Sequence, residues 1–502
     1  MHARKAISLI FPSLLLAACS ALPAPTPSST AALPGPIDSP AATGSASESA
    51  IPSLVPSPTA ISSPAASAPA PSTPSGPTAA PTPQPPAFAA WPTYGGNRQR
   101  SGVAASGFPA PNRPAIAWNV ALDGAVYGQP IIATGRLLVA TEHDSVYALS
   151  PSTGRALWRR HLGTPVPLSS LPCGNIDPLG ITSTPVFDPA TGSLFVVAEV
   201  TGPKHVLFAL NPATGGVRWS RTVDWPGQDP RTHQQRAGLA LANGRVYVGF
   251  GGLAGDCGQY NGVVVGVPTS GQGASVAYVV PTAREGAVWA TGGPVIDAAG
   301  NLYISVGNGS STSTYDGSDS VVELSPTLKQ LSFFAPSTWA SDNAGDRDLG
   351  SMSPVLLSGG WVFIDGKSGT GYVLRQGSLG GIGGQVSARS VCRAFGASAH
   401  VGSTAYVPCT DGIRAVTVSS SGAIQIAWHT SSGASGPPAI GGGTVWSVNI
   451  ATGVLYALSQ SSGAVRASIR LGAVPHFDAP SLSGGFVFVG TLRGVIGIKV
   501  AR

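Results

Sequence analysis

The chain has 502 residues, of which only 10% are charged, and it is rich in glycine (66) and proline (46). This composition suits strands joined by turns and argues against long helices. The formal net charge is +6, and two of the positive charges, Arg4 and Lys5, lie at the extreme N-terminus. With so mild a charge, no Lys/Arg cluster and no nucleic-acid-binding motif, we expect no nucleic-acid partner.

Residues 1–18 have the pattern of a secretory signal peptide, with a basic start and an apolar run at 7–16 that is too short for a transmembrane helix. The run ends in LAAC at 16–19, which resembles the bacterial lipobox. That resemblance implies cleavage before Cys19 and lipidation of this cysteine, whereas an ordinary signal peptide with an incidental cysteine is the alternative. We expect an exported lipoprotein that is anchored to a membrane through Cys19.

Residues 19–88 form a linker of proline, serine, alanine and threonine. Residues 20–88 contain 18 prolines, and Asp38 and Glu48 are the only charges. Such a composition cannot bury an apolar core, so the segment is predicted to be a disordered stalk. As a flexible coil it would span on the order of 50 Å.

The rest of the chain is organised around the stretch VYALSPSTGRALW, residues 146–158. It predicts a strand, a tight turn and a second strand, because proline presets φ near −65° and glycine allows positive φ in the turn. The unit recurs as VLFALNPATGGVRW, VVVGVPTSG and VVELSPT, and in weaker form four more times. The last apolar residue before each turn is Leu149, Leu210, Val267, Leu324, Leu374, Val416, Leu458 or Ile498. Eight strand-only repeats spaced about 40–60 residues apart predict an all-β, eight-bladed β-propeller over residues 89–502.

The two ends of this domain are expected to close the ring. The last repeat, 484–500, lacks an outer strand, whereas residues 115–122 (AIAWNVAL) form a lone strand of the outer type. Pairing them would complete the eighth blade and leave no free sheet edge. Insertions at 169–180, 251–261 and 308–317 lengthen blades two to four. Because insertions in repeat proteins gather on one face, we expect the first half of the chain to build most of any site.

Four cysteines follow Cys19, and an even number in an exported domain indicates disulfides. Cys392 and Cys409 belong to one repeat, so we predict that they pair. Cys173 and Cys257 would then join two of the insertions. Buried free thiols are the alternative, and no histidine is spaced for a zinc site.

The segment WPTYGGNRQRSG at 91–102 and the recurring VYALxxxTGxxxW unit resemble bacterial proteins built from pyrroloquinoline quinone (PQQ) repeats. That superfamily includes the quinoprotein alcohol dehydrogenases and the lipoprotein of the outer-membrane β-barrel assembly machinery. The two share a fold and differ in function, so the resemblance implies the propeller and leaves the function open.

The resemblance to the dehydrogenases implies PQQ and Ca²⁺ in the central funnel, and several motifs of that group have counterparts here in the same chain order. Glu199 lies ten residues before Ala209 of a repeat strand, and Asn308 ends the segment GGPVIDAAGNLYISVGN. The implied calcium ligands are Glu199 and Asn308, the cofactor-contacting residues are Trp289 and Lys367, and the catalytic carboxylates are Asp346 and Asp348. These types suit the chemistry, since calcium prefers oxygen ligands, PQQ needs an aromatic plane and an alcohol needs a base.

Several features depart from the dehydrogenase pattern. The chain has no adjacent cysteine pair, and no tryptophan follows the repeats at Val267, Leu324 and Leu374. Asp346 and Asp348 could instead cap turns, and Trp289 could belong to the core. Two functions therefore follow: a non-catalytic binding or scaffold module that holds an envelope protein or a glycan, which we favour, and a PQQ- and calcium-dependent dehydrogenase of alcohols or sugars. The dehydrogenase requires Glu199, Asn308 and the two aspartates to converge on one funnel mouth.

Overall fold

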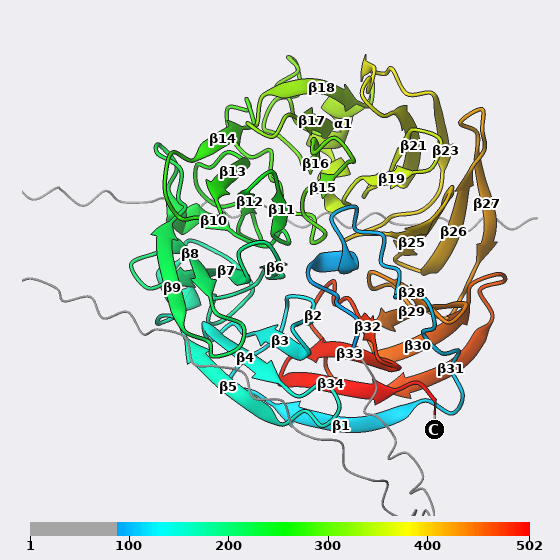
Figure 1. The fold of residues 1–502 in the computed structure, drawn as a ribbon. Helices are drawn as coiled ribbons and strands as arrows, with labels where there is room; N and C mark the ends of the chain where they lie inside the picture. The colour runs from blue at the N-terminus through cyan, green and yellow to red at the C-terminus, as the bar shows by residue number, and fades with distance from the viewer. Residues whose placement is uncertain (1–87, 502) are drawn as a thin grey trace, which may run out of the picture. The chain divides into compact units, whose positions relative to one another are not determined.

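The computed structural model describes residues 88–501, and these form eight blades around a central axis (Figure 1), antiparallel throughout except that β22 pairs parallel with β18. Six blades have four strands and two have five. The prediction of an all-β, eight-bladed propeller is confirmed. The signal peptide at 1–18, Cys19 and the stalk up to residue 87 lie outside the described residues.

The first four blades follow one another along the chain. Blade 1 comprises β2 (Ile131–Ala133), β3 (Arg136–Ala140), β4 (Ser145–Leu149) and β5 (Ala156–His161). Blade 2 comprises β6 (Val186–Asp188), β7 (Ser193–Val200), β8 (Lys204–Leu210) and β9 (Val217–Thr222). Blade 3 comprises β10 (His233–Gln234), β11 (Ala240–Ala242), β12 (Arg245–Gly252), β13 (Val263–Pro268) and β14 (Val276–Val279). Blade 4 comprises β15 (Val295–Ile296), β16 (Leu302–Val306), β17 (Ser320–Leu324), β18 (Gln330–Ala335) and β22 (Gly381–Ile382).

The last four blades complete the ring. Blade 5 comprises β19 (Val355–Leu357), β20 (Trp361–Ile364), β21 (Thr370–Arg375) and β23 (Ser387–Ser390). Blade 6 comprises β24 (Ala399–Val401), β25 (Thr404–Cys409), β26 (Gly412–Val418) and β27 (Ile424–His429). Blade 7 comprises β28 (Ala439–Gly441), β29 (Thr444–Asn449), β30 (Val454–Ser459) and β31 (Val465–Arg470). Blade 8 comprises β32 (Ser481–Ser483), β33 (Phe486–Thr491), β34 (Gly494–Lys499) and β1 (Ala115–Ala121).

The helical segments in the described part of the chain are short. They are η1 (Tyr94–Gly96), η2 (Leu168–Ser170), η3 (Pro230–Thr232), α1 (Trp339–Ala344) and η4 (Leu349–Ser351). Within residues 88–501 no helix has the length and apolar character needed to cross a membrane.

The repeat unit recognised in the sequence forms the third and fourth strands of a blade. In blade 1 these are β4 and β5, joined by the turn at 150–155, where Gly154 has φ 71°. The ladder shifts register between Ala148 and Leu149, immediately before the turn, and the same shift recurs in blade 2 between Ala209 and Leu210. Similar turn sequences, SPSTG in blade 1 and NPATG in blade 2, therefore produce the same backbone geometry.

Tryptophans on the fourth strands join neighbouring blades. The indole Nε1 of Trp158 in blade 1 donates to the Pro212 carbonyl of blade 2 at 3.0 Å. Trp428 of blade 6 donates in the same way to Gln460 of blade 7 at 3.1 Å. A Cβ on the turn glycine of the next blade would clash with the ring, as at Gly215, where it would lie 2.6 Å from Trp158. The turn glycine, which recurs from blade to blade, thus makes room for the indole of the neighbouring blade.

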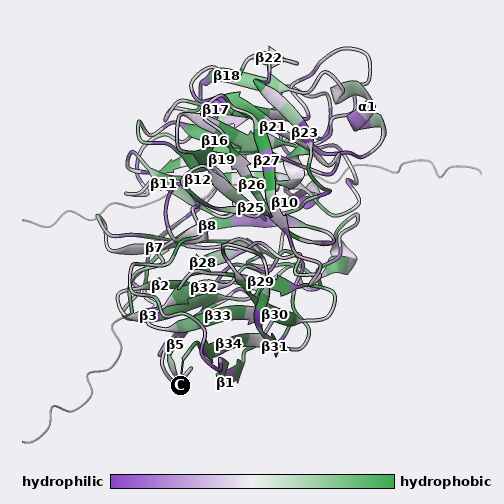
Figure 2. Cartoon of the chain, turned by 90° about the vertical axis from the view of Figure 1, so that its right-hand side faces the viewer, coloured by the Kyte–Doolittle hydropathy of each residue, from purple (hydrophilic) through white to green (hydrophobic). Residues whose placement is uncertain are grey.

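Strand β1 closes the ring as predicted. It pairs antiparallel with β34, so that a strand from the beginning of the domain becomes the outer strand of blade 8. The apolar core lies within and between blades: one buried cluster, for example, contains residues of blades 1 and 2. Figure 2 shows the strands of the blades as largely hydrophobic, with hydrophilic residues concentrated on the loops.

The segment before β1 plugs the centre of the ring, where η1 lies in Figure 1. The Trp91 indole, 2% exposed, donates to Gln129 Oε1 at 3.1 Å, and the Arg100 guanidinium donates to the Leu239 carbonyl at 2.9 Å. Tyr94 forms a buried cluster with Ala397, in the link between blades 5 and 6, and Ala479, in the link between blades 7 and 8. The central channel is therefore filled by the protein's own N-terminal segment.

Candidate functional site

A cavity of about 430 Å³ lies at the centre of one face of the propeller. This face, the cavity face, carries the loops between the second and third strands of each blade and the links between blades. The opposite face, the turn face, carries the repeat turns such as 150–155. The cavity is lined by Asn175, Gln234, Arg236, Gly252, Leu253, Ala254, Gly255, Asp256, Tyr260, Glu285, Ala287, Trp289, Asn308, Asp346, Asp348, Lys367, Phe395, His476 and Phe477.

The first half of the propeller contributes most of the residues that line this cavity, as expected for a site. All three insertions contribute to the lining, through Asn175, the stretch 252–260 and Asn308. From the link between blades 4 and 5 onward, the chain adds Asp346, Asp348, Lys367, Phe395, His476 and Phe477. Five of the six residues assigned to cofactor chemistry also line this cavity, namely Trp289, Asn308, Asp346, Asp348 and Lys367.

The five residues form one polar network around the ammonium group of Lys367. Lys367 Nζ lies 2.6 Å from Asp346 Oδ1 and 3.5 Å from Asp348 Oδ2. The Trp289 indole N–H donates to Asp348 Oδ2 at 2.8 Å, and Asn308 Nδ2 donates to Asp346 Oδ1 at 2.8 Å. Both carboxylates therefore already hold a cation that belongs to the protein.

The ionisation of this network follows from burial and charge. Burial raises the pKa of Asp348 to about 6, although the Lys367 charge and the Trp289 hydrogen bond act in the other direction. Burial by itself would lower the pKa of Lys367, but the attraction of Asp348 and Asp346 outweighs it and the pKa is raised. Lys367 thus stays charged at neutral pH and is paired with the aspartates.

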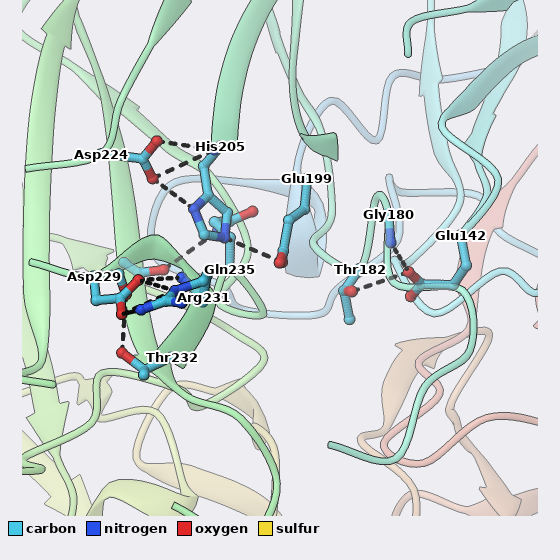
Figure 3. Close-up of polar contacts among 11 residues, drawn as sticks. Glu142, Gly180, Thr182, Glu199, His205, Asp224, Asp229, Arg231, Thr232 and Gln235 are labelled. Carbon is cyan, nitrogen blue, oxygen red and sulfur yellow. Dashed lines mark hydrogen bonds and ion pairs between the residues drawn. The ribbon is translucent and has the colours of Figure 1, made fainter. Parts of the chain in front are cut away.

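Glu199 does not line the cavity. It lies near the end of β7 directly opposite His205 of β8, and its side chain is 2% exposed (Figure 3). His205 Nε2 lies 3.1 Å from Glu199 Oε2, while His205 Nδ1 lies 2.7 Å from Asp224 Oδ1. Burial lowers the pKa of His205, but the two carboxylates outweigh it and raise it to about 10, so the imidazolium bridges them. The expected convergence of Glu199 with Asn308 is therefore absent, because a cross-strand histidine engages this carboxylate.

A signal for the Glu199–His205 pair was present in the sequence. The two residues lie at equal distances from Gly202, which has φ 98° in the turn between β7 and β8. Residues placed symmetrically about a hairpin turn face each other across the ladder. The histidine was therefore a foreseeable partner for the glutamate.

The aromatic wall of the cavity was not foreseen. The rings of Phe395 and Phe477 stack with centroids 5.7 Å apart, and Trp289 lies 5.9 Å from Phe477. The Arg236 guanidinium lies 4.7 Å from the centre of the Phe477 ring. These residues come from blade links, which carry no repeat signal.

Both predicted disulfides are present in the structure. Cys173 and Cys257, with Cα atoms 6.0 Å apart, join the insertions at 169–180 and 251–261. A Cβ on Gly255, which lines the cavity, would lie 3.4 Å from Cys173 Sγ, so this bridge is at the cavity rim. Cys392 and Cys409, with Cα atoms 5.7 Å apart, link the connection after blade 5 to β25.

The cavity fits a planar ligand such as PQQ better than it fits a calcium ion. Its volume and the Trp289 ring could accommodate a planar ligand, and Asn308 Oδ1 and Asp348 Oδ1 are buried without a hydrogen-bond partner. Calcium, however, takes six to eight oxygen ligands. Lys367 pairs with both aspartates and offsets one of their two charges, Glu199 is engaged elsewhere, and over residues 88–501 no three His, Cys, Asp or Glu side chains converge in a metal-binding group. As arranged, the donor set does not fit a calcium ion.

Solved structures with the same fold include proteins of both functional kinds. The quinohemoprotein alcohol dehydrogenase of Comamonas testosteroni matches with a TM-score of 0.61 at 17% identity, over 82% of this chain and 81% of that one. A europium-containing methanol dehydrogenase gives a TM-score of 0.62 at 14% identity, over 81% and 90% of the two chains. BamB of Moraxella catarrhalis gives 0.53 at 13% identity, over 77% and 99%.

At these identities the structural matches establish the fold alone. No curated protein sequence matches the chain. Residues 118–376, more than half of the chain, match the family described as outer membrane protein assembly factor BamB, and the chain therefore belongs to this family of PQQ-repeat β-propellers.

Proposed function

We propose that the protein is a binding module of the cell envelope, whose cavity holds a segment of another protein or a glycan without transforming it. The observation that carries this proposal is the position of the Lys367 ammonium group between Asp346 and Asp348. A general base or a metal ligand needs a free carboxylate, and here both are paired within the protein. A preformed cavity with a few fixed polar groups and aromatic walls is typical of a binding site.

The direction in which the chain enters the propeller supports the same role. The first described residue, Phe88, packs against Phe486 at 5.8 Å and meets Gly484 in the turn between the first two strands of blade 8. In an antiparallel blade that turn and the loop after the second strand lie at opposite ends, so Phe88 is on the turn face. The described chain therefore enters the propeller on the face opposite the cavity, and this attachment leaves the cavity face open to a partner.

The proposal is tested by site-specific photo-crosslinking of the full chain in its native cells. A benzophenone amino acid at Phe395, inside the cavity, is expected to capture one discrete partner. The same group at Ile116, which is 42% exposed on the outer strand β1, serves as the matched control. Equal labelling from both positions, or none from the cavity, would count against a binding role for this site.

A PQQ-dependent dehydrogenase of alcohols or sugars is the second candidate. It is favoured by one observation, that the five counterparts of the dehydrogenase residues line a single cavity in the family's chain order. The family name describes an assembly factor, and the two dehydrogenase structures show that the same fold carries redox chemistry in other proteins.

A titration of the full chain, carrying Cys19→Ser for solubility, with PQQ in the presence and absence of Ca²⁺ separates the two functions. The binding module is expected to show no calcium-dependent saturable uptake by calorimetry. Saturable, calcium-dependent binding that is lost in Asn308→Ala would instead establish the cofactor site. Glu199→Gln is the informative companion, because a residue outside the cavity should leave PQQ binding unchanged.

A further inference from the structure

Arg236 is the basic residue in the cavity whose charge is not matched by the protein. Lys367 pairs with two aspartates, whereas the Arg236 guanidinium has neither an ion pair nor a hydrogen-bond acceptor within residues 88–501. Its contact is the face of Phe477, at 4.7 Å from the ring centre. Stacking on an aromatic face leaves the N–H groups at the guanidinium edge free to donate.

The backbone around β10 aims two donors into the same space. Gln234 ends β10, Arg236 follows two residues later, and both side chains line the cavity. Gln235 between them is engaged elsewhere, since its Nε2 donates to the Ala237 carbonyl at 2.7 Å. Gln234 is 4% exposed, and its amide makes no hydrogen bond with the described residues. The cavity wall thus carries two donor groups that the described residues leave without an acceptor.

The surrounding charges do not compensate Arg236. The titratable groups that act on it most are Tyr127 and Glu142. Burial raises the pKa of Glu142 to about 8, so this carboxyl group is mostly protonated at neutral pH. It is also turned to other partners, since its Oε2 accepts from the Gly180 amide at 2.8 Å (Figure 3). Burial lowers the pKa of Arg236 to about 10, which still leaves it charged.

We propose that Arg236 and Gln234 form an oxyanion subsite that receives a carboxylate or phosphate group of the cavity's ligand, with Asn175, which lines the same cavity, as a further donor. This inference rests on the proposed binding function and defines the ligand's chemistry. A guanidinium edge matches the two oxygens of such a group and binds them through parallel hydrogen bonds. The rings of Phe395 and Phe477 adjoin the subsite and would hold an apolar or planar part of the same ligand.

Calorimetric titration of the full chain carrying Cys19→Ser, with benzoate, phenyl phosphate and the neutral benzamide, tests the subsite. The two anions are expected to bind at least about tenfold more tightly than benzamide, and their ratio tells a carboxylate site from a phosphate site. Arg236→Gln should abolish that preference and leave benzamide binding unchanged. Arg236→Lys keeps the positive charge but lacks the planar guanidinium edge, so it should retain the preference for anions only in part.

Arg221→Gln is the matched control, because Arg221 lies on β9 and donates to the Gly273 carbonyl outside the cavity. Unfolding midpoints of all variants confirm that each is folded. Equal affinity for benzamide and benzoate, no binding of any probe at about 10 mM, or wild-type anion binding by Arg236→Gln would each overturn the subsite. A cross-linked partner that persists in Arg236→Gln would refute the subsite alone. Anion binding without any cross-linked partner would refute the proposed function alone.

Discussion

Trp118→Ala is expected to lower the free energy of unfolding of the propeller by about 3–5 kcal/mol, which is the usual loss for truncating a well-packed tryptophan. Trp118 lies on β1, the strand that closes the ring, and its ring packs against Phe488 at 5.9 Å. Its Nε1 donates to the Pro151 carbonyl of blade 1 at 3.1 Å. A Cβ on Gly154 or Gly497 would clash with its ring. One side chain therefore holds the N-terminal strand, blade 8 and blade 1 together.

Chemical denaturation of the variant and of Trp428→Ala measures this effect. Trp428 makes the equivalent hydrogen bond between blades 6 and 7, at 3.1 Å. Its strand, β27, however, follows the other three strands of blade 6 consecutively in the chain. Loss of the Trp428 ring should cost local packing without opening the ring of blades, so the stability of Trp428→Ala should fall less. Ile116→Ala, on the exposed side of β1, should be nearly neutral. If Trp118→Ala and Trp428→Ala lost equal free energies of unfolding, the junction closed by β1 would be no more sensitive than the other blade junctions.

The outer half of each blade could be predicted because its signal is local. A run such as VYAL followed by a proline- and glycine-containing turn specifies two antiparallel strands and the bend between them, and the structure has β4 and β5 there. The last repeat has no outer strand of its own after β34, which predicted that β1 pairs with β34, as the structure shows. Blade number and ring closure follow from these repeats alone.

The inner part of the molecule could not be read in the same way. The innermost strands are very short, with three residues in β2 and two in β15, which is too few for an alternating pattern. The cavity is assembled from links of six different blade junctions and loops, so no stretch of sequence describes it. Arg236 and Phe477, which stack on each other, lie far apart in the chain.

The assignment of site residues was limited for a related reason. Matching to a family pattern placed five residues around one cavity, because chain order and spacing fix which blade each belongs to. It could not show that Lys367 would pair with Asp346 at 2.6 Å, or that His205 would engage Glu199. Those pairings depend on neighbours from other strands, and the proposed binding function rests on them.

Thermal stability is expected to be greatest near about pH 4 and to fall steadily toward about pH 9. Burial raises the pKa of Glu142 to about 8, of Asp144 to about 9 and of Asp365 to about 8. Between the unfolded and folded pKa values the native state holds a proton that the unfolded chain releases. Each such group therefore lowers the free energy of unfolding by about 1.4 kcal/mol per pH unit over that window, and the stabilisation present at low pH is lost as pH rises.

Two histidines also change the free energy of unfolding, His233 on the acidic side and His205 on the alkaline side of the pH range. Two carboxylates overcome burial and raise the pKa of His205 to about 10, so His205 adds to the loss of stability above the unfolded pKa of about 6.5. Burial lowers the pKa of His233 to about 4, so His233 opposes the trend only below that unfolded value. The carboxyl groups outnumber this single opposing group, which places the maximum on the acidic side of neutrality.

Calorimetric unfolding from about pH 5 to pH 9 measures the slope, and Asp365→Asn should make it shallower by roughly one group's contribution. Asp229→Asn is the control, because hydrogen bonds from Arg231 lower the pKa of Asp229 and leave it ionised in both states above about pH 5. A stability that instead rises toward pH 8 would mean that the buried carboxyl groups are ionised in the native protein. Asp144 has no hydrogen-bond partner for either oxygen among the described residues, so of these groups it should resist ionisation most strongly.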